Sequence, residues 1–270
     1  MNRGELEEQI VLKRSCLCVG LDSELKKIPR HLPSGPKGVL AFNKSIIDAT
    51  RDICVSYKIN TAFYEVLGAD GWSVMRKTIE YIGSKHFIIA DAKRGDIGNT
   101  AEQYVNAFYD QLGADAITLS PYMGSDSLIP FLSVQEKWGI VLALTSNPGS
   151  KDLQWQNSDG KYLFEHVVDL VLEHGTPENS MFVVGGTRTN DLEVMRAACP
   201  NHFFLVPGVG KQGGTVADVI KAGASKTKGM GLLINSSRSI IFASSEKNYA
   251  DAARQSAKNL QAQMVRFISS

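Results

Sequence analysis

The sequence IIADAKRGDIGNT, residues 88–100, begins as an apolar run typical of a buried strand and ends as a polar segment typical of a helix start. Within six residues it places Asp91, Lys93 and Asp96. Alternate residues of an extended strand share a face, so Asp91 and Lys93 are expected to point the same way at the strand's end. Because such a cluster of charges is costly to bury, we interpret it as the candidate catalytic centre.

The rest of the chain repeats the order of a short apolar strand followed by a helix. Strands are predicted at residues 16–21, 55–60, 86–90, 116–119, 139–144, 181–184, 203–206 and 231–235. Helices are predicted at residues 2–13, 39–53, 71–82, 100–112, 125–135, 161–174, 191–198, 216–222 and 248–267, and a long polar loop at 145–160. This alternation predicts an α/β fold with a parallel sheet, and eight units in about 250 residues match a (β/α)8 TIM barrel.

A doubly wound open sheet is the competing fold. It usually places a glycine-rich phosphate loop after the first strand. Here the glycine-rich loop, residues 207–214, follows the seventh strand, which favours the barrel. No change of composition marks a linker, so we expect a single domain over residues 1–270, with the N-terminal and C-terminal helices packed outside it.

Composition excludes several classes of protein. The 270 residues are 43% hydrophobic and 21% charged, and the net charge of +1 gives no bulk attraction to nucleic acid or membrane. The 4 Cys residues show no C-x-x-C spacing, which predicts reduced thiols in a cytoplasmic protein. The acidic residues 1–8 have no apolar core, so no signal peptide is expected, and no apolar run is long enough to cross a bilayer.

Polar residues recur where the predicted strands end, which is where barrels carry their active sites. These residues are Asp22, Lys58, Asp91, Lys93, Ser146, Gln212 and Arg238. The loop that includes Pro207, Gly208 and Gly213 offers backbone N–H groups to a phosphate, and Arg238 adds a bidentate donor in the same corner. We therefore expect a phosphorylated small molecule as the ligand.

Other readings of these residues stay open at this point. Asp91, Lys93 and Asp96 fit a surface salt-bridge set or a Mg²⁺ site as well as a catalytic centre. A cation at Lys58 is a poor neighbour for a metal, although Lys58 alone also fits a solvated lysine, and Asp22 a turn residue. In a site, a lysine held between carboxylates stays charged and acts as a general acid. We interpret Glu65, after the second strand, as a solvated loop carboxylate.

The segment from Asp91 to Thr100 resembles the Asp-x-Lys-x-x-Asp-Ile-x-x-Thr motif of the orotidine 5′-phosphate decarboxylases. Flanking segments are similar in order across residues 16–245, and the segment after the fifth strand resembles the longer, type 2 branch of that family. These segments are VGLD (19–22), YKIN (57–60), LTSNPG (144–149), VPGVGKQGG (206–214) and SSR (236–238).

The resemblance implies a cofactor-free and metal-free lyase of pyrimidine biosynthesis that converts orotidine 5′-phosphate to uridine 5′-phosphate (UMP). Lys93 would protonate the C6 carbon that loses CO₂, and Asp91 would crowd the substrate carboxylate. Asp22 and Lys58 would hold ribose hydroxyls and complete the charge network. Asp96 and Thr100 would reach into the partner's site in a homodimer with shared active sites.

The remaining roles implied by the resemblance concern the base and the phosphate. Ser146 would bind the pyrimidine ring, Gln212 would span ring and phosphate, and Arg238 would bind phosphate. Pro207, Gly208, Gly213 and Ser237 are also expected to bind the substrate. Two alternatives remain: a Mg²⁺-dependent sugar-phosphate aldolase or decarboxylase of the same barrel superfamily, and a non-catalytic nucleotide-binding barrel.

Overall fold

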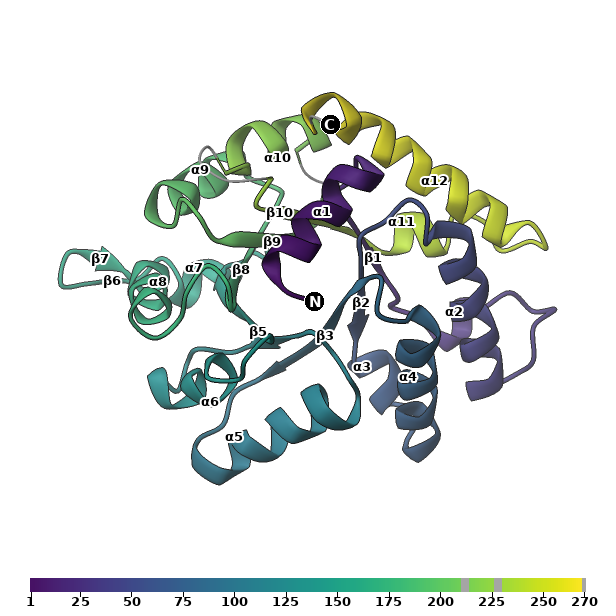
Figure 1. Ribbon diagram of the computed structural model, residues 1–270, viewed down its shortest axis with the longest axis horizontal. Coiled ribbons are helices and arrows are strands. Elements are labelled where there is room, and N and C mark those ends of the chain that lie inside the picture. The colour runs from purple at the N-terminus through teal and green to yellow at the C-terminus, as the bar shows by residue number, and fades with distance from the viewer. Residues whose placement is uncertain (210–213, 226–229, 269–270) are drawn as a thin grey trace.

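Eight parallel strands close into a barrel in the order β1-β10-β9-β8-β5-β4-β3-β2, which confirms the (β/α)8 prediction and excludes the open sheet (Figure 1). The computed structural model describes residues 1–209, 214–225 and 230–268. The barrel strands are β1 (Leu17–Gly20), β2 (Ser56–Asn60), β3 (Phe87–Arg94), β4 (Ala116–Leu119), β5 (Trp138–Leu144), β8 (Ser180–Val184), β9 (Phe203–Pro207) and β10 (Leu232–Ser236).

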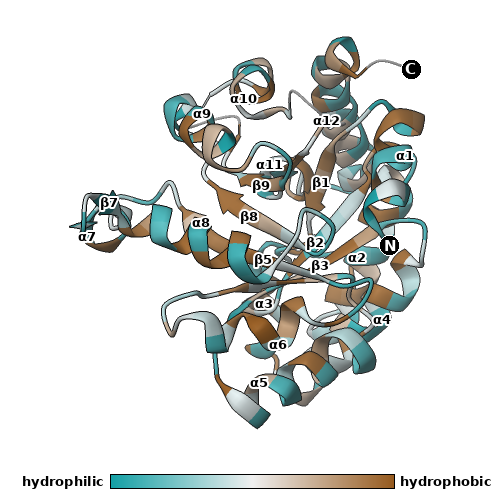
Figure 2. Cartoon of the chain, turned by 60° about the vertical axis from the view of Figure 1, so that its left-hand side comes forward, coloured by the Kyte–Doolittle hydropathy of each residue, from teal (hydrophilic) through white to brown (hydrophobic). Residues whose placement is uncertain are grey.

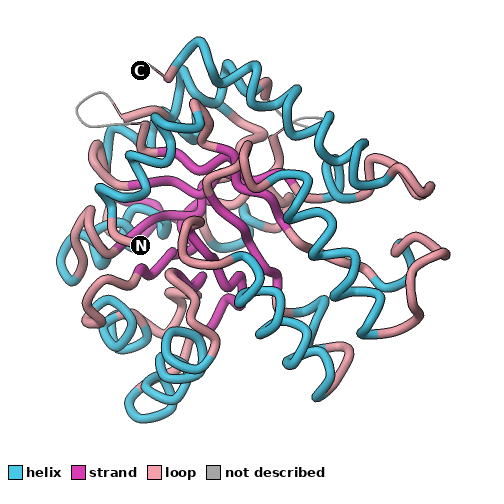
Figure 3. The backbone as a smooth tube through the Cα atoms, turned by 45° about the vertical axis from the view of Figure 1, so that its right-hand side comes forward, coloured by secondary structure: helices cyan, strands magenta, loops and turns pink. Residues whose placement is uncertain are grey.

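Helices surround the strands, and the strands occupy the middle of the molecule (Figure 3). They are α1 (Arg3–Lys13), α2 (Pro36–Thr50), α3 (Ala62–Glu65), α4 (Ala69–Ile82), α5 (Gly98–Val105), α6 (Ile129–Leu132), α7 (Ser150–Leu153), α8 (Leu163–His174), α9 (Thr189–Ala198), α10 (Val216–Gly223), α11 (Arg238–Ile241) and α12 (Tyr249–Met264). In α2, Val39, Phe42 and Ile46 are fully buried, as the helical spacing of these apolar residues requires.

Three predicted segments differ from the structure. Residues 125–135 form a 3-10 turn and the short α6 instead of one helix, because Pro130 at the start of α6 cannot continue a preceding helix. Residues 100–112 begin as α5 but continue as a π-helical turn, Asn106–Gln111. The polar tract after β5 is structured: it contains α7 and a hairpin of β6 (Asn157–Ser158) and β7 (Lys161–Tyr162). This hairpin projects from the barrel and is mostly hydrophilic (Figures 1 and 2).

Helix α1 lies across the amino ends of the barrel strands. The buried Arg3 donates hydrogen bonds of 2.8 Å to the carbonyl oxygens of Pro177 and Asn201, which precede β8 and β9. The indole of Trp138, at the start of β5, donates to the Met1 carbonyl at 3.1 Å. This end of the barrel is thereby covered, and the carboxyl ends of the strands remain for a binding site.

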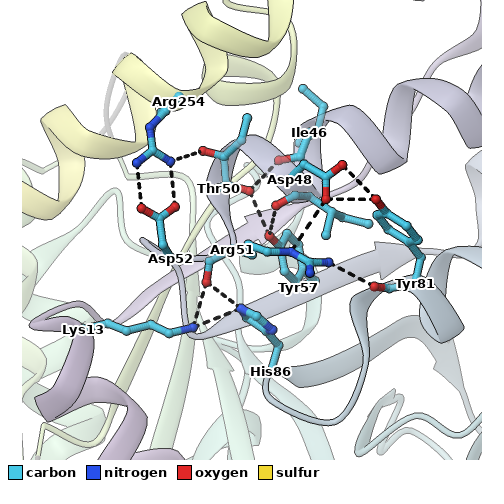
Figure 4. A network of polar contacts seen from close by, with 12 residues as sticks. Lys13, Ile46, Asp48, Thr50, Arg51, Asp52, Tyr57, Tyr81, His86 and Arg254 are labelled. Carbon is cyan, nitrogen blue, oxygen red and sulfur yellow. Dashed lines mark hydrogen bonds and ion pairs between the residues drawn. The ribbon is translucent and has the colours of Figure 1, made fainter.

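A second set of polar contacts ties α1 and α12 to the segment after α2 (Figure 4). The Lys13 ammonium donates to the carbonyl oxygens of Arg51 and Cys54 at 2.9 and 2.8 Å, and lies 3.0 Å from the His86 Nε2 atom. Arg254 on α12 forms a bidentate ion pair with Asp52, with both N–O distances at 2.6 Å. These contacts close the fold on the side opposite the carboxyl ends.

The four cysteines Cys16, Cys18, Cys54 and Cys199 are free and buried, as the prediction of reduced thiols requires. Burial raises the pKa of the Cys16 and Cys18 thiols to about 12, so neither forms a thiolate readily. In the part of the chain that the structure describes, none of the helices has the length and apolar character needed to cross a membrane.

Candidate active site

The carboxyl end of β3 carries an irregular backbone that brings Asp91 and Lys93 together. The β3–β4 ladder shifts register between Ala90 and Arg94, and Lys93 has a φ of +47°, in the left-handed region that residues with a side chain seldom adopt. The Lys93 Nζ atom lies 2.6 Å from Asp91 Oδ1. The two side chains therefore share a face as expected, but through a strained turn of the backbone and not through regular strand alternation.

Asp91 is the centre of the charge network. Its Oδ2 atom accepts a hydrogen bond from Lys58 Nζ at 2.8 Å, while Oδ1 accepts from Lys93 at 2.6 Å. Lys58 Nζ also lies 3.4 Å from Asp22 Oδ1. The Asp91 carboxylate thus sits between the ammonium groups of Lys58 on β2 and Lys93 on β3. The Lys58 ammonium also has the Asp22 carboxylate beside it.

The electrostatics of this network keep its buried members charged. Burial alone raises the pKa of Asp91, but the ammonium groups of Lys58 and Lys93 outweigh it and lower that pKa to about 2. Burial lowers the pKa of Lys58, yet the negative charges of Asp91 and Asp22 reverse this and raise it overall. Lys58 and Asp91 are almost fully buried, whereas the Lys93 side chain is 48% exposed and faces the open end of the barrel.

Thr118, on β4, belongs to this network although it is not among the residues expected from the sequence. Its hydroxyl donates to Asp91 Oδ1 at 3.0 Å and accepts the backbone N–H of Lys93 at 2.9 Å. It therefore satisfies the N–H group that the irregular backbone removes from the sheet ladder. A threonine near the end of a strand is an ordinary β-former, so only its position next to β3 signals this role.

The loop after β10 reaches back over the end of β1, next to Asp22. The Ser237 hydroxyl donates to the Gly20 carbonyl at 3.0 Å. A Cβ atom at Gly20 would lie 2.7 Å from the Ser237 Cβ, so this close approach requires glycine. Arg238 is exposed and begins α11 immediately after Ser237. The structure therefore places Ser237 against the end of β1, two residues before Asp22, and Arg238 directly after it in the chain.

Ser146, Pro207 and Gly208 meet at a corner formed by the loops after β5, β8 and β9. A Cβ atom at Gly185, directly after β8, would lie 2.6 Å from the Ser146 Cβ, so the β5 loop packs directly on this glycine. A Cβ at Gly208, which has a φ of +86°, would lie 3.9 Å from the Ser146 Oγ. Pro207 accepts a hydrogen bond from the N–H of Gly186 at 2.9 Å. Gln212 and Gly213 lie outside the described residues.

In the part of the chain that the structure describes, Asp96 and Thr100 form no hydrogen bond with the Asp91 network. The Asp96 Oδ1 atom accepts the N–H of Ile97 at 2.9 Å, and Thr100 is exposed on α5. The neighbouring Ile97 side chain is 46% exposed. A single chain therefore presents this end of the motif on its surface.

The interpretation of Glu65 as a solvated loop carboxylate is wrong. Glu65, on α3, forms an ion pair with Arg94, the last residue of β3. The Arg94 guanidinium also lies 5.4 Å from the ring centres of Tyr104 and Phe108. This pair links α3 to the end of β3 and supports the strand that carries Asp91 and Lys93.

Among residues 1–209, 214–225 and 230–268, the His, Cys, Asp and Glu side chains form no group of three that would hold a metal ion. The position between Asp22 and Asp91 is taken by the Lys58 ammonium, which is hydrogen-bonded to Asp91. The charges of the two carboxylates are thus balanced by two ammonium groups of this protein, those of Lys58 and Lys93.

Fold and site together define a TIM-barrel enzyme whose charged groups lie at the carboxyl ends of its strands. Residues 15–253 match the sequence profile of the orotidine 5′-phosphate decarboxylase / HUMPS family, and the chain belongs to that family. It is 50% identical to the orotidine 5′-phosphate decarboxylase of Bacteroides fragilis over 98% of this chain and 97% of that one. The corresponding protein of Phocaeicola vulgatus is 49% identical over 99% of both chains.

A solved structure supports the same relationship. Leishmania donovani OMP decarboxylase is 35% identical to this chain, with a TM-score of 0.81 and 98% of both chains covered. The family predicted from the segment 91–100 and its flanks is therefore confirmed.

Proposed function

We propose that this protein decarboxylates orotidine 5′-phosphate to UMP in pyrimidine biosynthesis, without a cofactor or metal ion. The observation that carries the proposal is the arrangement of Lys93 and Lys58 on the two oxygens of Asp91, at 2.6 and 2.8 Å. The membership of the family and the names of its relatives agree with this reaction.

In the proposed reaction, the bond between C6 of the pyrimidine and its carboxylate breaks, CO₂ leaves, and the electron pair stays on C6. Lys93 then transfers a proton from Nζ to C6, which gives UMP. The fixed negative charge of Asp91 is unfavourable beside the substrate carboxylate but not beside neutral CO₂. The Lys93 ammonium is favourable beside the developing carbanion, so both groups stabilise the transition state relative to the bound substrate.

A Mg²⁺-dependent aldolase or decarboxylase of sugar phosphates is the alternative within the same fold. Such a site needs free carboxylate oxygens, whereas both oxygens of Asp91 accept hydrogen bonds from Lys58, Lys93 and Thr118. A non-catalytic nucleotide-binding barrel would have no use for the strained Lys93 backbone. These contacts favour the metal-free decarboxylase.

We also propose that the protein is a homodimer in which Asp96 and Thr100 complete the partner's site. Ile97, between them, is half exposed, and the neighbouring loop after β4 exposes Tyr122 and Met123 by 80% and 50%. That loop lies against the β3 end, because a Cβ at Gly95 would lie 2.9 Å from the Ser120 carbonyl oxygen. Exposed apolar side chains next to the motif are typical of an interface. The buried free thiols support a reducing, cytoplasmic location.

The test is the loss of orotidine 5′-phosphate absorbance with purified protein, in buffer with and without EDTA. The proposal predicts turnover that chelation leaves unchanged. Activity that disappears with EDTA and returns with Mg²⁺ would favour the aldolase-type alternative. Binding of UMP without any turnover would favour the non-catalytic alternative.

A further inference from the structure

The side-chain amide of Gln154 forms two hydrogen bonds with Thr145, the residue immediately before Ser146. Its Oε1 atom accepts the backbone N–H of Thr145 at 2.8 Å, and its Nε2 atom donates to the Thr145 hydroxyl at 2.8 Å. Gln154 is half-buried and follows α7, in the segment after β5. One side chain therefore holds both the backbone and the side chain of Thr145.

Arg188 holds Thr145 from the other side. Its Nη2 atom donates to the Thr145 carbonyl at 3.5 Å, a long contact, and its Nε atom pairs with Asp191 Oδ2 at 2.8 Å. The Thr145 carbonyl belongs to the same rigid peptide group as the N–H of Ser146. Gln154 therefore fixes the peptide group before Thr145, and Arg188 adds a long contact to the peptide group that leads into Ser146.

Gln154 is itself anchored by the segment that carries it. Its backbone N–H donates to the Ser150 carbonyl at 2.8 Å, and its carbonyl accepts the N–H of Phe164 at 3.1 Å. The next residue, Trp155, packs edge-on against Phe164 with ring centres 5.2 Å apart. The Gln154 side chain thus projects from a fixed base toward the β5 loop.

We propose that Gln154 is a positioning residue that aims Ser146 at the pyrimidine ring of the nucleotide. The inference rests on the proposed function, in which Ser146 binds that ring. In this role, the segment between β5 and α8, which carries Gln154, contributes to recognition of the base. Because the phosphate is held at the other end of the nucleotide, loss of Gln154 should weaken recognition of the base and leave recognition of the sugar phosphate intact.

The test compares competitive inhibition by UMP with inhibition by ribose 5-phosphate, which lacks the base. Gln154→Leu removes both hydrogen bonds to Thr145 and keeps most of the side-chain volume. We expect the variant to weaken inhibition by UMP about three- to tenfold, which is the range for a lost uncharged hydrogen bond. Inhibition by ribose 5-phosphate should stay unchanged. Gln154→Glu keeps an acceptor for the Thr145 N–H, so it should weaken inhibition by UMP less than Gln154→Leu does. Gln156→Leu is the matched control, because Gln156 is exposed in the same segment.

The Ser146→Ala background separates positioning from a general effect on the fold. If Gln154 acts through Ser146, Gln154→Leu adds no further loss of UMP affinity once the Ser146 hydroxyl is absent. Equal weakening of both ligands, additive losses in that background, or a Gln154→Leu variant that matches Gln156→Leu would overturn the inference. If Gln154→Leu does not fold, Gln154→Glu decides by the same comparison. A wild-type protein without decarboxylase activity would contradict the proposed function instead.

Discussion

The Lys58 ammonium lies 2.8 Å from Asp91 Oδ2, and the two residues come from the adjacent strands β2 and β3. Asp91 is thereby held from one side by a buried lysine and from the other by Lys93, which faces the open end of the barrel. The buried lysine fixes the carboxylate, and the exposed lysine is free to meet a substrate. In the proposed function, Lys58 fixes the carboxylate and Lys93 reacts with the substrate.

Thr118→Val should lower both activity and stability. The change preserves shape but removes the donor to Asp91 Oδ1 and the acceptor of the Lys93 N–H. Because a buried N–H loses its partner, we expect a loss of about 1–3 kcal/mol in the free energy of unfolding, measured by urea denaturation. We expect kcat to fall by about tenfold, since one lost hydrogen bond of about 1.4 kcal/mol corresponds to that factor. Thr118→Ser retains the hydroxyl, and a serine variant as impaired as valine would contradict this role.

Arg196→Met should destabilise the fold without changing the chemistry. The buried guanidinium donates to the carbonyl oxygens of Gly223, Cys199, Pro200, His202 and Gly231 and lies 3.8 Å from the ring centre of Phe204. Methionine fills similar space but leaves these acceptors without donors, so we expect a loss of about 3 kcal/mol in the free energy of unfolding. The exposed Arg76 provides the control, Arg76→Met. Equal stability of the two variants would contradict the prediction.

His86 should make stability decrease as the pH falls from about 6.5 to 4. Burial and the nearby Lys13 ammonium lower the pKa of His86 from 6.5 to about 4. Between these values the unfolded chain binds the proton and the folded chain does not, so the stabilisation is complete above pH 6.5 and is lost on acidification, up to about 3 kcal/mol. Burial lowers the pKa of His202 to about 4 as well, so it contributes in the same window.

His86→Gln tests this dependence through urea denaturation at pH 7.5 and at pH 5. The variant removes the ionisable group, so its stability should fall less than that of the wild type between the two pH values. His31→Gln, at an exposed position, should keep the wild-type dependence. A His86→Gln variant with an unchanged pH dependence would show that His86 does not carry the effect.

Mixing Lys93→Ala with Asp96→Ala protein should restore activity if the sites are shared between subunits. Each variant alone has one defect in both of its sites. A mixed dimer carries both defects in one site and leaves the other intact, so random reassortment should recover about a quarter of wild-type activity. The measurement is decarboxylation before and after subunit exchange, and each variant mixed with itself is the control. No recovery, despite exchange, would place Asp96 in the same site as Lys93.

The barrel was predictable because its strands are short apolar runs at regular intervals. Residues 203–206, for example, read as a buried strand, and β9 is the strand observed there, Phe203–Pro207. The prediction of one helix at 125–135 is wrong because Pro130, at the start of α6, cannot continue the preceding 3-10 turn. The polar tract after β5 has no hydrophobic period, yet local hydrogen bonds such as that of Gln154 to Thr145 give it structure.

The candidate site was predictable where its residues are charged. Asp22, Lys58, Asp91 and Lys93 stand at strand ends in the sequence, and the structure joins them in one network. Thr118 carries no charge, and its role depends on the backbone of Lys93 leaving the ladder, a tertiary feature with no sequence pattern. The partner of Glu65 was missed for a similar reason, since Arg94 follows 29 residues later.

The most direct test of the central claim is turnover of orotidine 5′-phosphate by Lys93→Ala in metal-free buffer, together with its affinity for UMP. If Lys93 donates the proton to C6, kcat should fall by at least about 10²–10⁴-fold, the range for general acid catalysis, while UMP still binds through its phosphate. Lys85→Ala, at an exposed position before β3, should behave as the wild type. A Lys93→Ala protein that decarboxylates at close to the wild-type rate would contradict the account.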